Sequence, residues 1–455
     1  MGLRIYNPLF FRAFKSGTPR AIGLGVKAST LLLVIQFSVV SLSGQYASAS
    51  GEGTLAAQQT SADLSAHKVL TLEQALSLAE QNSPLLSEAS ASVNRARAGV
   101  QSARAYKNPE AQFMAGDQSA RPITTPGVPG SLWHYSASQT LEIPRERKLR
   151  QQTSRLGQSA IEHRADGIKL SVMADVKRAF FDVIRRKEQL AHTQSNLELV
   201  EDLCKKVRIE ITVGEKGKLE LTRAEAELAR AQASVRSAGI ELAHARAKLK
   251  SVIGIDTEES IDADGTLTNT VTLSPLGELR PQVLASHPAL AEANAQIDRS
   301  RTAVEHEKSL RIPQPTVSGE YERQPDISYY RFGVNIPLPT WDKRKGPIAE
   351  AQAEVARAEA MSRQRKLEIV AALERAYDQF QISNQQVLGL EKGSLREATA
   401  AVEAARAAYK YGERGIVEVL DAQRVLQGVR SDLLEASFSR QSALIDLEEL
   451  GVTSK

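Results

Sequence analysis

Apolar residues recur at alternating steps of three and four along two segments of the chain. This apolar period of 3.5 residues is typical of coiled-coil helices. A long helical pattern precedes each segment, over residues 146–212 and 344–410, so we predict a pair of antiparallel helices at each place. The positions are Leu221, Ala224, Leu228, Ala231, Val235, Ala238, Leu242, Ala245, Leu249 and Val252, then Val419, Ala422, Leu426, Val429, Leu433, Ala436, the polar Arg440, Ala443, Leu447 and Leu450.

Two glycines separate the helices of each predicted pair, in "VGEKGKLEL" (213–221) and "YGERGIVEV" (411–419). A glycine inside a helix costs about 1 kcal/mol relative to alanine, so these positions favour a turn. "GERG" lacks the lysine and hydroxyl residue of a phosphate-binding loop and does not lie between a strand and a helix. We therefore predict hairpin tips, and no nucleotide site, at Gly214, Gly217, Gly412 and Gly415.

The glycine motif belongs to a larger internal duplication. Gly214 and Gly412 are separated by 198 residues, and the segment around Pro84 recurs 204 residues later around Pro288. The difference is explained by a longer insertion in the first copy, "SARPITTPGVPGS". We therefore predict two copies of a unit of about 200 residues. The predicted order is signal peptide 1–49, N-terminal extension 50–69, first repeat 70–253, linker 254–279 with some β structure, second repeat 280–452 and tail 453–455.

Each copy begins with a predicted helix, over about 71–105 or 276–310, that a proline ends. Two strand-like segments follow in each copy. In "WHYSASQTLEI" and "YRFGVNIPL" apolar and polar residues alternate, which predicts strands with one apolar face. The predicted fold class is mainly helical with a β part. The alternating apolar residues are Trp133, Tyr135, Ala137, Leu141 and Ile143, then Tyr330, Phe332, Val334, Ile336 and Leu338.

The N-terminus predicts export. Residues 1–49 contain five basic residues and no acid, then an apolar stretch and small residues ending at Ala47 and Ala49. This pattern is typical of a cleaved secretory signal. A membrane anchor is the alternative, but the apolar stretch is shorter than the roughly 20 residues that a span needs. Without these five residues the 58 Lys and Arg become 53, against 54 Asp and Glu, so no basic excess points to nucleic acid.

The polar residues predict no enzyme chemistry, cofactor or metal site. The seven histidines are scattered without a pair at metal-ligand spacing. Cys204 is the only cysteine, in a helical setting that suggests a small buried residue. It cannot form a disulfide within the chain.

The elements together predict a conduit. Four strands cannot close a membrane barrel, which needs at least about eight, and open sheet edges do not persist in hydrocarbon. If the strands face lipid, several chains must pool them. An exported protein with pooled strands at one end and long coiled coils at the other would form a duct.

The chain resembles the TolC family of outer-membrane efflux ducts, and within it the CzcC-like branch of heavy-metal efflux. The resemblance covers about residues 70–452 and is carried by "LTLEQALSLAEQNSP", "SQTLEIPRERKLR", "KRAFFDVI", "GVNIPLPTWDKRKGPIAEAQAEV" and "GERGIVEVLDAQRVLQGVR". It implies a homotrimer with a shared twelve-stranded β-barrel in the outer-membrane lipid and an α-helical tunnel in the periplasm of a Gram-negative bacterium. It also implies a periplasmic adaptor (membrane fusion) protein and an inner-membrane RND-type pump as partners. The absence of a cysteine near the cleavage site argues against an acyl anchor.

The resemblance also implies roles for residues at the tips. Glu418 and Asp421 would form acidic rings that favour cations at the narrowest point. Arg414 and Tyr409 match the positions of closing contacts, with Arg414 facing the acid at Glu220. The four tip glycines would dock the adaptor.

Three functions remain open from the sequence. The first is a passive duct for divalent heavy-metal cations. The second is a duct for drugs or for type I protein secretion, because the family shares one architecture across cargoes. The third is a periplasmic coiled-coil adaptor or scaffold without a barrel, against which two full copies with strand pairs argue.

Overall fold

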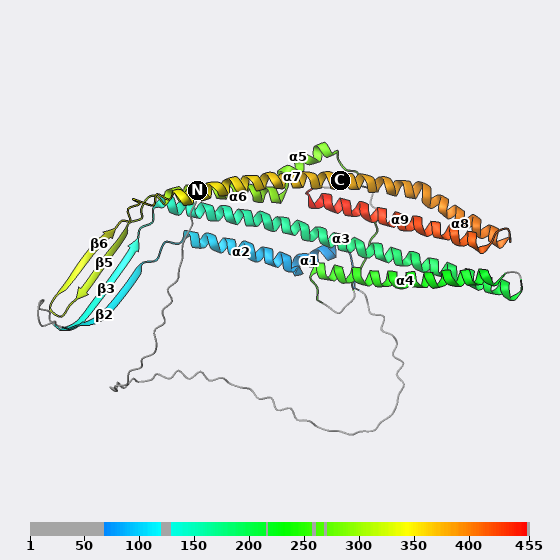
Figure 1. Cartoon of the computed structure of the whole chain (residues 1–455), viewed down its shortest axis with the longest axis horizontal. Helices are drawn as coiled ribbons and strands as arrows, with labels where there is room; N and C mark the ends of the chain where they lie inside the picture. Colours follow the sequence, from blue (N-terminus) through cyan, green and yellow to red (C-terminus); the bar gives the residue numbers. More distant parts are fainter. Residues whose placement is uncertain (1–67, 120–128, 215–216, 257–260, 268–270, 453–455) are drawn as a thin grey trace, which may run out of the picture. The chain divides into compact units, whose positions relative to one another are not determined.

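Two long helical hairpins dominate the structure (Figure 1). The computed structural model describes residues 68–119, 129–214, 217–256, 261–267 and 271–452, so the predicted signal peptide, most of the extension and the tail lie outside it. The first hairpin joins α3 (Pro144–Thr212) to α4 (Lys218–Ile253). The second joins α7 (Lys345–Gly389), a π-helical turn (Leu390–Ser394) and α8 (Leu395–Lys410) to α9 (Ile416–Glu449). At 1.5 Å per residue the 69 residues of α3 extend over about 100 Å.

The predicted coiled-coil seams are confirmed. Every seam position in α4 and α9 is buried or half-buried. The polar interruption is part of the seam, because Arg440 is only 6% exposed and its Nη1 lies 3.5 Å from Oδ1 of Asn384 on α7. A buried guanidinium needs such a polar partner.

The helix predicted at the start of each copy is in fact two helices. The structure has α1 (Leu72–Asn82) and α2 (Pro84–Arg104) in the first copy, and α5 (Leu276–Ser286) and α6 (Pro288–Ser309) in the second. The breaks fall at Ser83 (ψ 122°) and His287 (ψ 124°), each directly before a proline. A residue before proline is pushed out of the α conformation, so the prediction of one continuous helix was wrong.

The helices lie side by side in a fixed order. Near the tips the order is α4, α3, α9 and α7–α8, and nearer the strands it is α2, α3, α6 and α7 (Figure 1). The largest apolar core joins α1, α3 and α4, with Leu434 and Ile445 of α9 contributing. The two internal repeats of the chain therefore meet where α3 contacts α9 and α6. Helices α4 and α7–α8 lie at the edges.

A short parallel pair of strands ties the linker to the start of the described chain. β1 (Lys68–Leu70) pairs with β4 (Ile261–Ala263), which confirms β structure in the linker. The carboxylate of Asp262 in β4 accepts from Lys187 at 3.0 Å and lies 3.2 Å from Arg246. Burial alone would raise the pKa of Asp262, but the hydrogen bond from Lys187 and the charge of Arg246 lower it. The linker is thus bound to the helices by ionic contacts.

The four predicted strands form one antiparallel sheet. Its order is β2 (Glu110–Gln118), β3 (Gly130–Thr140), β5 (Thr316–Arg323) and β6 (Ser328–Asn335), so β2 and β6 are the edge strands. Two residues of each predicted alternating set, including Leu141 and Leu338, lie beyond the strand ends. Because β3 pairs with β5, the sheet joins the two copies.

The π-helical turn coincides with a change in spacing between the copies. On its strand side, buried Val176 and Val183 of α3 correspond to buried Leu373 and Phe380 of α7, a separation of 197 residues. On its tip side the separation is the 198 residues already seen between the tip glycines.

The second copy therefore contains one additional residue within this interval. Buried Val200 and Cys204 of α3 correspond to buried Ala398 and Val402 of α8 only at the longer spacing. In the π turn the amide of Leu395 donates to the carbonyl of Leu390, five residues earlier. The wider turn absorbs the added residue, so α8 keeps the same face buried.

Candidate functional site

Each hairpin turns on a glycine in the left-handed region. Gly214 has a φ of +85° and Gly412 a φ of +71°. Other residues rarely adopt this conformation, which ends many helices. At the second tip the amide of Glu413 donates to the carbonyl of Ala408 at 2.9 Å. These contacts satisfy the last carbonyls of α8 as the chain reverses.

The second glycine of each pair lies at the tip but does not have a left-handed conformation. Gly217 and Gly415 have φ values of −85° and −82°, which any residue can adopt. They cap the N-termini of α4 and α9 in an extended conformation. A Cβ at Gly415 would meet Oε2 of Glu418 at 3.4 Å, whereas one at Gly217 would meet no described atom within 4 Å. Positive φ is therefore needed at only one glycine in each tip.

Tyr409 links the two hairpins just above the tips. Its hydroxyl donates to Oε2 of Glu210 on α3 at 2.7 Å. Burial raises the pKa of Tyr409, and the carboxylates of Glu210 and Glu220 raise it further. Oε2 of Glu220 is buried without a hydrogen-bond partner in the described chain. The structure thus brings two predicted gate residues, Tyr409 and Glu220, together with Glu210.

Glu210 was not predicted as a gate residue from the sequence. The duplication offers a signal that could have found it, because Glu210 directly precedes Ile211, the counterpart of Tyr409 at the 198-residue spacing. Residues at corresponding positions of two side-by-side hairpins lie at the same level.

Arg414, the third predicted gate residue, has a different partner from the one expected. Its ion pair in the described chain is with Glu418, at 4.0 Å between Nη1 and Oε1, and not with Glu220. Both side chains are exposed, and such a pair contributes only about 0–1 kcal/mol. Arg414 precedes α9 by two residues, so the first turn of that helix places Glu418 within reach.

The predicted pore acid Asp421 is also part of an ionic network. Its Oδ1 lies 3.1 Å from Nη1 of Arg424, and Nη2 of the same arginine lies 2.8 Å from Oε2 of Glu227 on α4. Asp421 and Glu418 both lie on the exposed part of α9. Each acid has an arginine three or four residues away, which lowers the local negative potential.

A cluster of ionic contacts, the α3–α9 clamp, joins α3 to the end of α9 and thus links the two internal repeats of the chain. Arg178 donates to Oδ1 of Asp446 at 2.8 Å and also contacts Glu449. Nζ of Lys177 lies 2.6 Å from Oε2 of Glu448. Burial alone would lower the pKa of Arg178, but the two carboxylates raise it. This clamp was not predicted, because the two segments are far apart in the sequence.

A second contact of the same junction lies nearer the tips. Nη1 of Arg185 lies 2.5 Å from Oε2 of Glu435, and its guanidinium lies 4.2 Å from the ring centre of Phe438. Guanidinium groups over aromatic faces are attracted by the ring quadrupole. With the Arg424–Glu227 pair, these contacts add ionic bonds to a junction that also has a buried apolar cluster near the tips, where Leu203 and Val207 of α3 pack with Val419 of α9.

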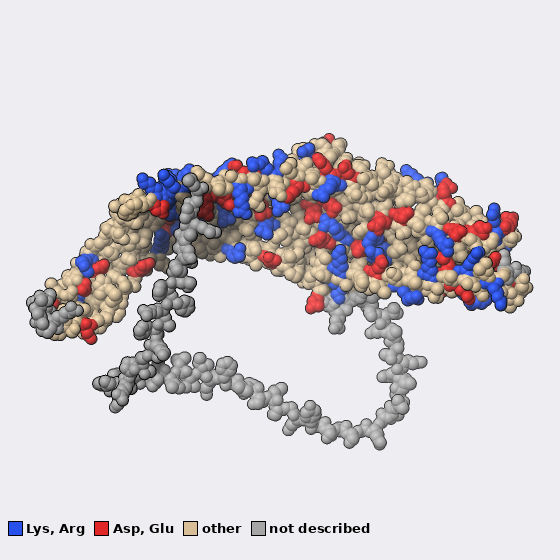
Figure 2. Space-filling view, in the orientation of Figure 1, with Lys and Arg blue, Asp and Glu red and all other residues tan. Residues whose placement is uncertain are grey.

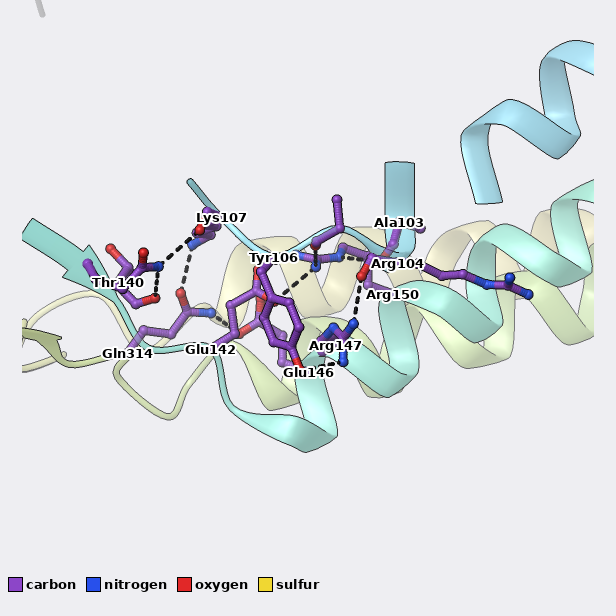
Figure 3. Close-up of polar contacts among 12 residues, drawn as sticks. Ala103, Arg104, Tyr106, Lys107, Thr140, Glu142, Glu146, Arg147, Arg150 and Gln314 are labelled. Atoms are coloured by element: carbon purple, nitrogen blue, oxygen red, sulfur yellow. Dashed lines mark hydrogen bonds and ion pairs between the residues drawn. The ribbon is translucent and has the colours of Figure 1, made fainter. Parts of the chain in front are cut away.

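Arginines of α3 hold the end of α2 where the helices meet the sheet (Figure 3). Arg150 donates to the carbonyls of Ala103 at 3.2 Å and Ala105 at 2.9 Å. Its guanidinium also binds Glu142 through two bonds of 2.7 and 3.0 Å, and the Glu142 side chain is 2% exposed. Paired bonds of this kind fix orientation as well as distance.

Neighbouring side chains extend this attachment to both internal repeats of the chain. Arg147 donates to the carbonyl of Arg104 at 2.7 Å and to the hydroxyl of Tyr106 at 2.9 Å (Figure 3). Nζ of Lys107 donates to Oε1 of Gln314, from the second copy, at 2.7 Å. The direction in which the sheet leaves the helices is therefore fixed by several independent bonds.

The sheet has one aromatic face and one polar face. Phe113, Tyr135, Tyr321 and Tyr330 lie opposite one another across all four strands, with ring centres 4.9, 6.2 and 4.9 Å apart. On the other face Glu322 contacts His134, Tyr329 and Arg331 at distances from 2.5 to 3.9 Å. Figure 2 shows few charged side chains over the strands, and a group of Lys and Arg where the strands join the helices.

The described residues contain no group of three or more His, Cys, Asp and Glu side chains arranged to hold a metal ion. Within the same residues, no helix combines the length and apolar character that crossing a membrane requires.

Comparison with known proteins identifies the family. The family described as outer membrane efflux protein matches residues 75–255 and 279–451, both copies of the duplication. The chain is 26% identical over 362 residues to the cobalt-zinc-cadmium resistance protein CzcC of Cupriavidus metallidurans, covering 78% of this chain and 84% of that protein. It is 24% identical over 318 residues to the nickel-cobalt-cadmium resistance protein NccC of Alcaligenes xylosoxydans, covering 68% and 69%.

A solved structure is similar to most of this chain. The crystal structure of CusC matches with a TM-score of 0.73 at 18% identity, over 84% of this chain and 92% of CusC. The predicted fold class and the resemblance to TolC-type ducts are thereby confirmed. The chain belongs to the outer membrane efflux protein family.

Proposed function

We propose that this chain is the outer-membrane duct of a tripartite efflux system and passes divalent heavy-metal cations out of the cell. Family membership supports the duct, and the similarity to CzcC over most of both chains supports the cargo. In this role the chain performs no chemistry. A pump in the inner membrane supplies the gradient, and an adaptor in the periplasm connects the pump to the duct.

The sheet supports assembly of several copies. Strands β2 and β6 each have one edge without a strand neighbour among the described residues. Backbone groups cannot remain unpaired in hydrocarbon, so these edges require strands from other copies. Three copies would supply twelve strands and place the aromatic row toward lipid and the Glu322 face toward water. This is the homotrimer that the resemblance implies.

The tips are the proposed gate. Tyr409, Glu210 and Glu220 join the two hairpins, and Glu418 and Asp421 would form rings of acid in a trimer. Arg414 and Arg424 lie beside these acids, so movement of either arginine would expose negative charge to a passing cation. We place the adaptor contact at Gly214, Gly217, Gly412 and Gly415, where the glycine turns leave the backbone accessible.

A deletion strain tests cargo and duct together. We expect loss of the gene to sensitise growth to some of zinc, cobalt, cadmium, nickel and copper, and the intact gene to restore growth. Sensitivity only to dyes, antibiotics or loss of a secreted protein would replace the metal cargo by the second function. Recovery of the protein by osmotic shock, without detergent, would contradict a membrane duct.

A further inference from the structure

We propose that neighbouring copies of this chain meet through an apolar contact in which Ile382 of α7 packs on Ile240 of α4 from the next copy. The inference rests on the proposed function, because a closed ring brings a second copy beside the first. It specifies two side chains at the boundary between chains, at a level where the corresponding contact inside the chain is made by an arginine.

The positions of the helices define the two surfaces that meet. Among the described elements, α4 packs mainly on α3, and α7 packs on α6 and α9, which leaves α4 and α7 at opposite edges (Figure 1). In the duplication α7 corresponds to α3 and α4 corresponds to α9. The contact between α3 and α9 within the chain therefore has a counterpart between α7 of one copy and α4 of the next.

The internal spacing identifies the residues. Ile382 follows Arg185 by 197 residues, the spacing on the strand side of the π turn, and Ile240 precedes Phe438 by 198 residues, the spacing in α4 and α9. Within the chain Arg185 lies over the ring of Phe438. Ile382 and Ile240 are 54% and 58% exposed, although both are large and apolar. Both members of one corresponding pair thus present apolar surface that the single chain leaves uncovered.

A second pair shows the same replacement. The in-chain ion pair of Arg424 with Glu227 corresponds to Ala226 and Val425 between copies. Val425 is 59% exposed on α9. At two separate levels, then, a contact made by an arginine inside the chain has an apolar counterpart between neighbouring chains.

A third pair keeps its charges but exchanges their positions. Lys177 binds Glu448 within the chain, and the corresponding residues are Glu374 on α7 and Lys250 on α4. Opposite charges therefore face each other in both cases. Glu374 also lies 3.9 Å from Arg280 of its own copy, which does not prevent it from facing a second cation. The neighbouring Arg178–Asp446 pair, by contrast, corresponds to two cations, Arg375 and Lys248, so the case for a second copy rests on the two apolar pairs.

Disulfide trapping tests the contact in the full chain in outer membranes. The variant carries Cys204→Ser, Ile382→Cys and Ile240→Cys. Two cysteines bond only when their Cα atoms lie within about 7 Å. After oxidation we expect most chains in covalent oligomers on a non-reducing gel, reversed by reductant. The matched control replaces Ile382→Cys by Leu367→Cys, which is also exposed but lies about 22 Å away along α7. We expect at least tenfold less crosslinking for the control.

A lysine-reactive crosslinker, applied to every variant and to the unaltered chain, distinguishes failure of this contact from failure of the proposed trimer. If oligomers form but the two introduced cysteines do not bond, or bond no better than the control, the contact is wrong and the proposed duct stands. If the unaltered chain forms no oligomer, the proposed trimer itself fails. Should the double variant fail to assemble, Ala226→Cys with Val425→Cys in the same background decides the matter, and no bond there refutes the inference.

Discussion

Deletion of Gly393 tests whether the π turn accommodates one residue that the first repeat lacks. In a regular helix, removing one residue rotates everything beyond it by about 100° and shifts it by about 1.5 Å. Within the π turn, the same deletion should restore an ordinary helix, and Ala398 and Val402 should keep their buried face. A glycine inside a helix also costs about 1 kcal/mol relative to alanine. We therefore expect the free energy of unfolding to change by less than about 1 kcal/mol.

Deletion of Gln194 in α3 is the matched control, because α3 has no π turn at the corresponding place. Beyond it lie three buried aliphatic residues, Val200, Leu203 and Val207. Turning these to solvent at about 2 kcal/mol each would cost about 6 kcal/mol. That is a large part of the 5–15 kcal/mol or so by which folded domains are stable.

Thermal unfolding of the two purified full-length variants, followed by far-ultraviolet circular dichroism, measures the difference. The variant without Gly393 should unfold close to the unaltered chain, and the variant without Gln194 should unfold at a clearly lower temperature or fail to accumulate in the outer membrane. Equal destabilisation by both deletions would show that the π turn does not absorb an added residue.

Three further outcomes follow from named contacts. Arg178→Ala should lower the free energy of unfolding by about 1–3 kcal/mol, because a partly exposed arginine leaves two carboxylates without their partner, whereas Arg375→Ala at the corresponding position should cost less; thermal unfolding of the pair checks this. Tyr409→Phe should lower the free energy of unfolding by about 1 kcal/mol and raise single-channel conductance in planar bilayers. An unchanged conductance would count against a role of Tyr409 in the gate. Asp262 has a lowered pKa when folded, so its contribution is complete above about pH 4 and is lost as the pH falls through the lower value. Asp262→Asn should therefore destabilise the chain at neutral pH and weaken its acid dependence, as unfolding measured across that range will show.

Much of the architecture could be predicted because local patterns of apolar and polar residues determine it. The seam of α4 and α9 follows from a 3.5-residue period, and the four strands from alternation, since burial on one side imposes these periods directly. The break at Ser83 was also accessible, because Pro84 follows it, but the helical pattern continuing on both sides concealed it. The duplication then located the tips.

Contacts between distant segments could not be predicted in the same way. The pairing of Arg178 with Asp446 joins residues that are 268 positions apart, and many other arginines and acids share their helices. Arg414 shows the same limit, since its expected acid came from resemblance while the local geometry favoured Glu418. The sequence does carry a sign of the added residue, since the spacing is 197 residues between Arg178 and Arg375 and 198 between the tip glycines, but only the burial pattern located it at the π turn.

The ionic contacts between α3 and α9 have a consequence for how a ring of such chains would assemble. Inside one chain the linker holds the two hairpins at a high effective concentration, so modest salt-sensitive contacts are sufficient to join them. Separate copies must find one another by diffusion and have no such advantage. If separate chains meet through the apolar contact proposed above, covalent fusion of the two repeats allows the contacts inside a chain to be partly ionic, while the contacts between chains would supply the free energy of association.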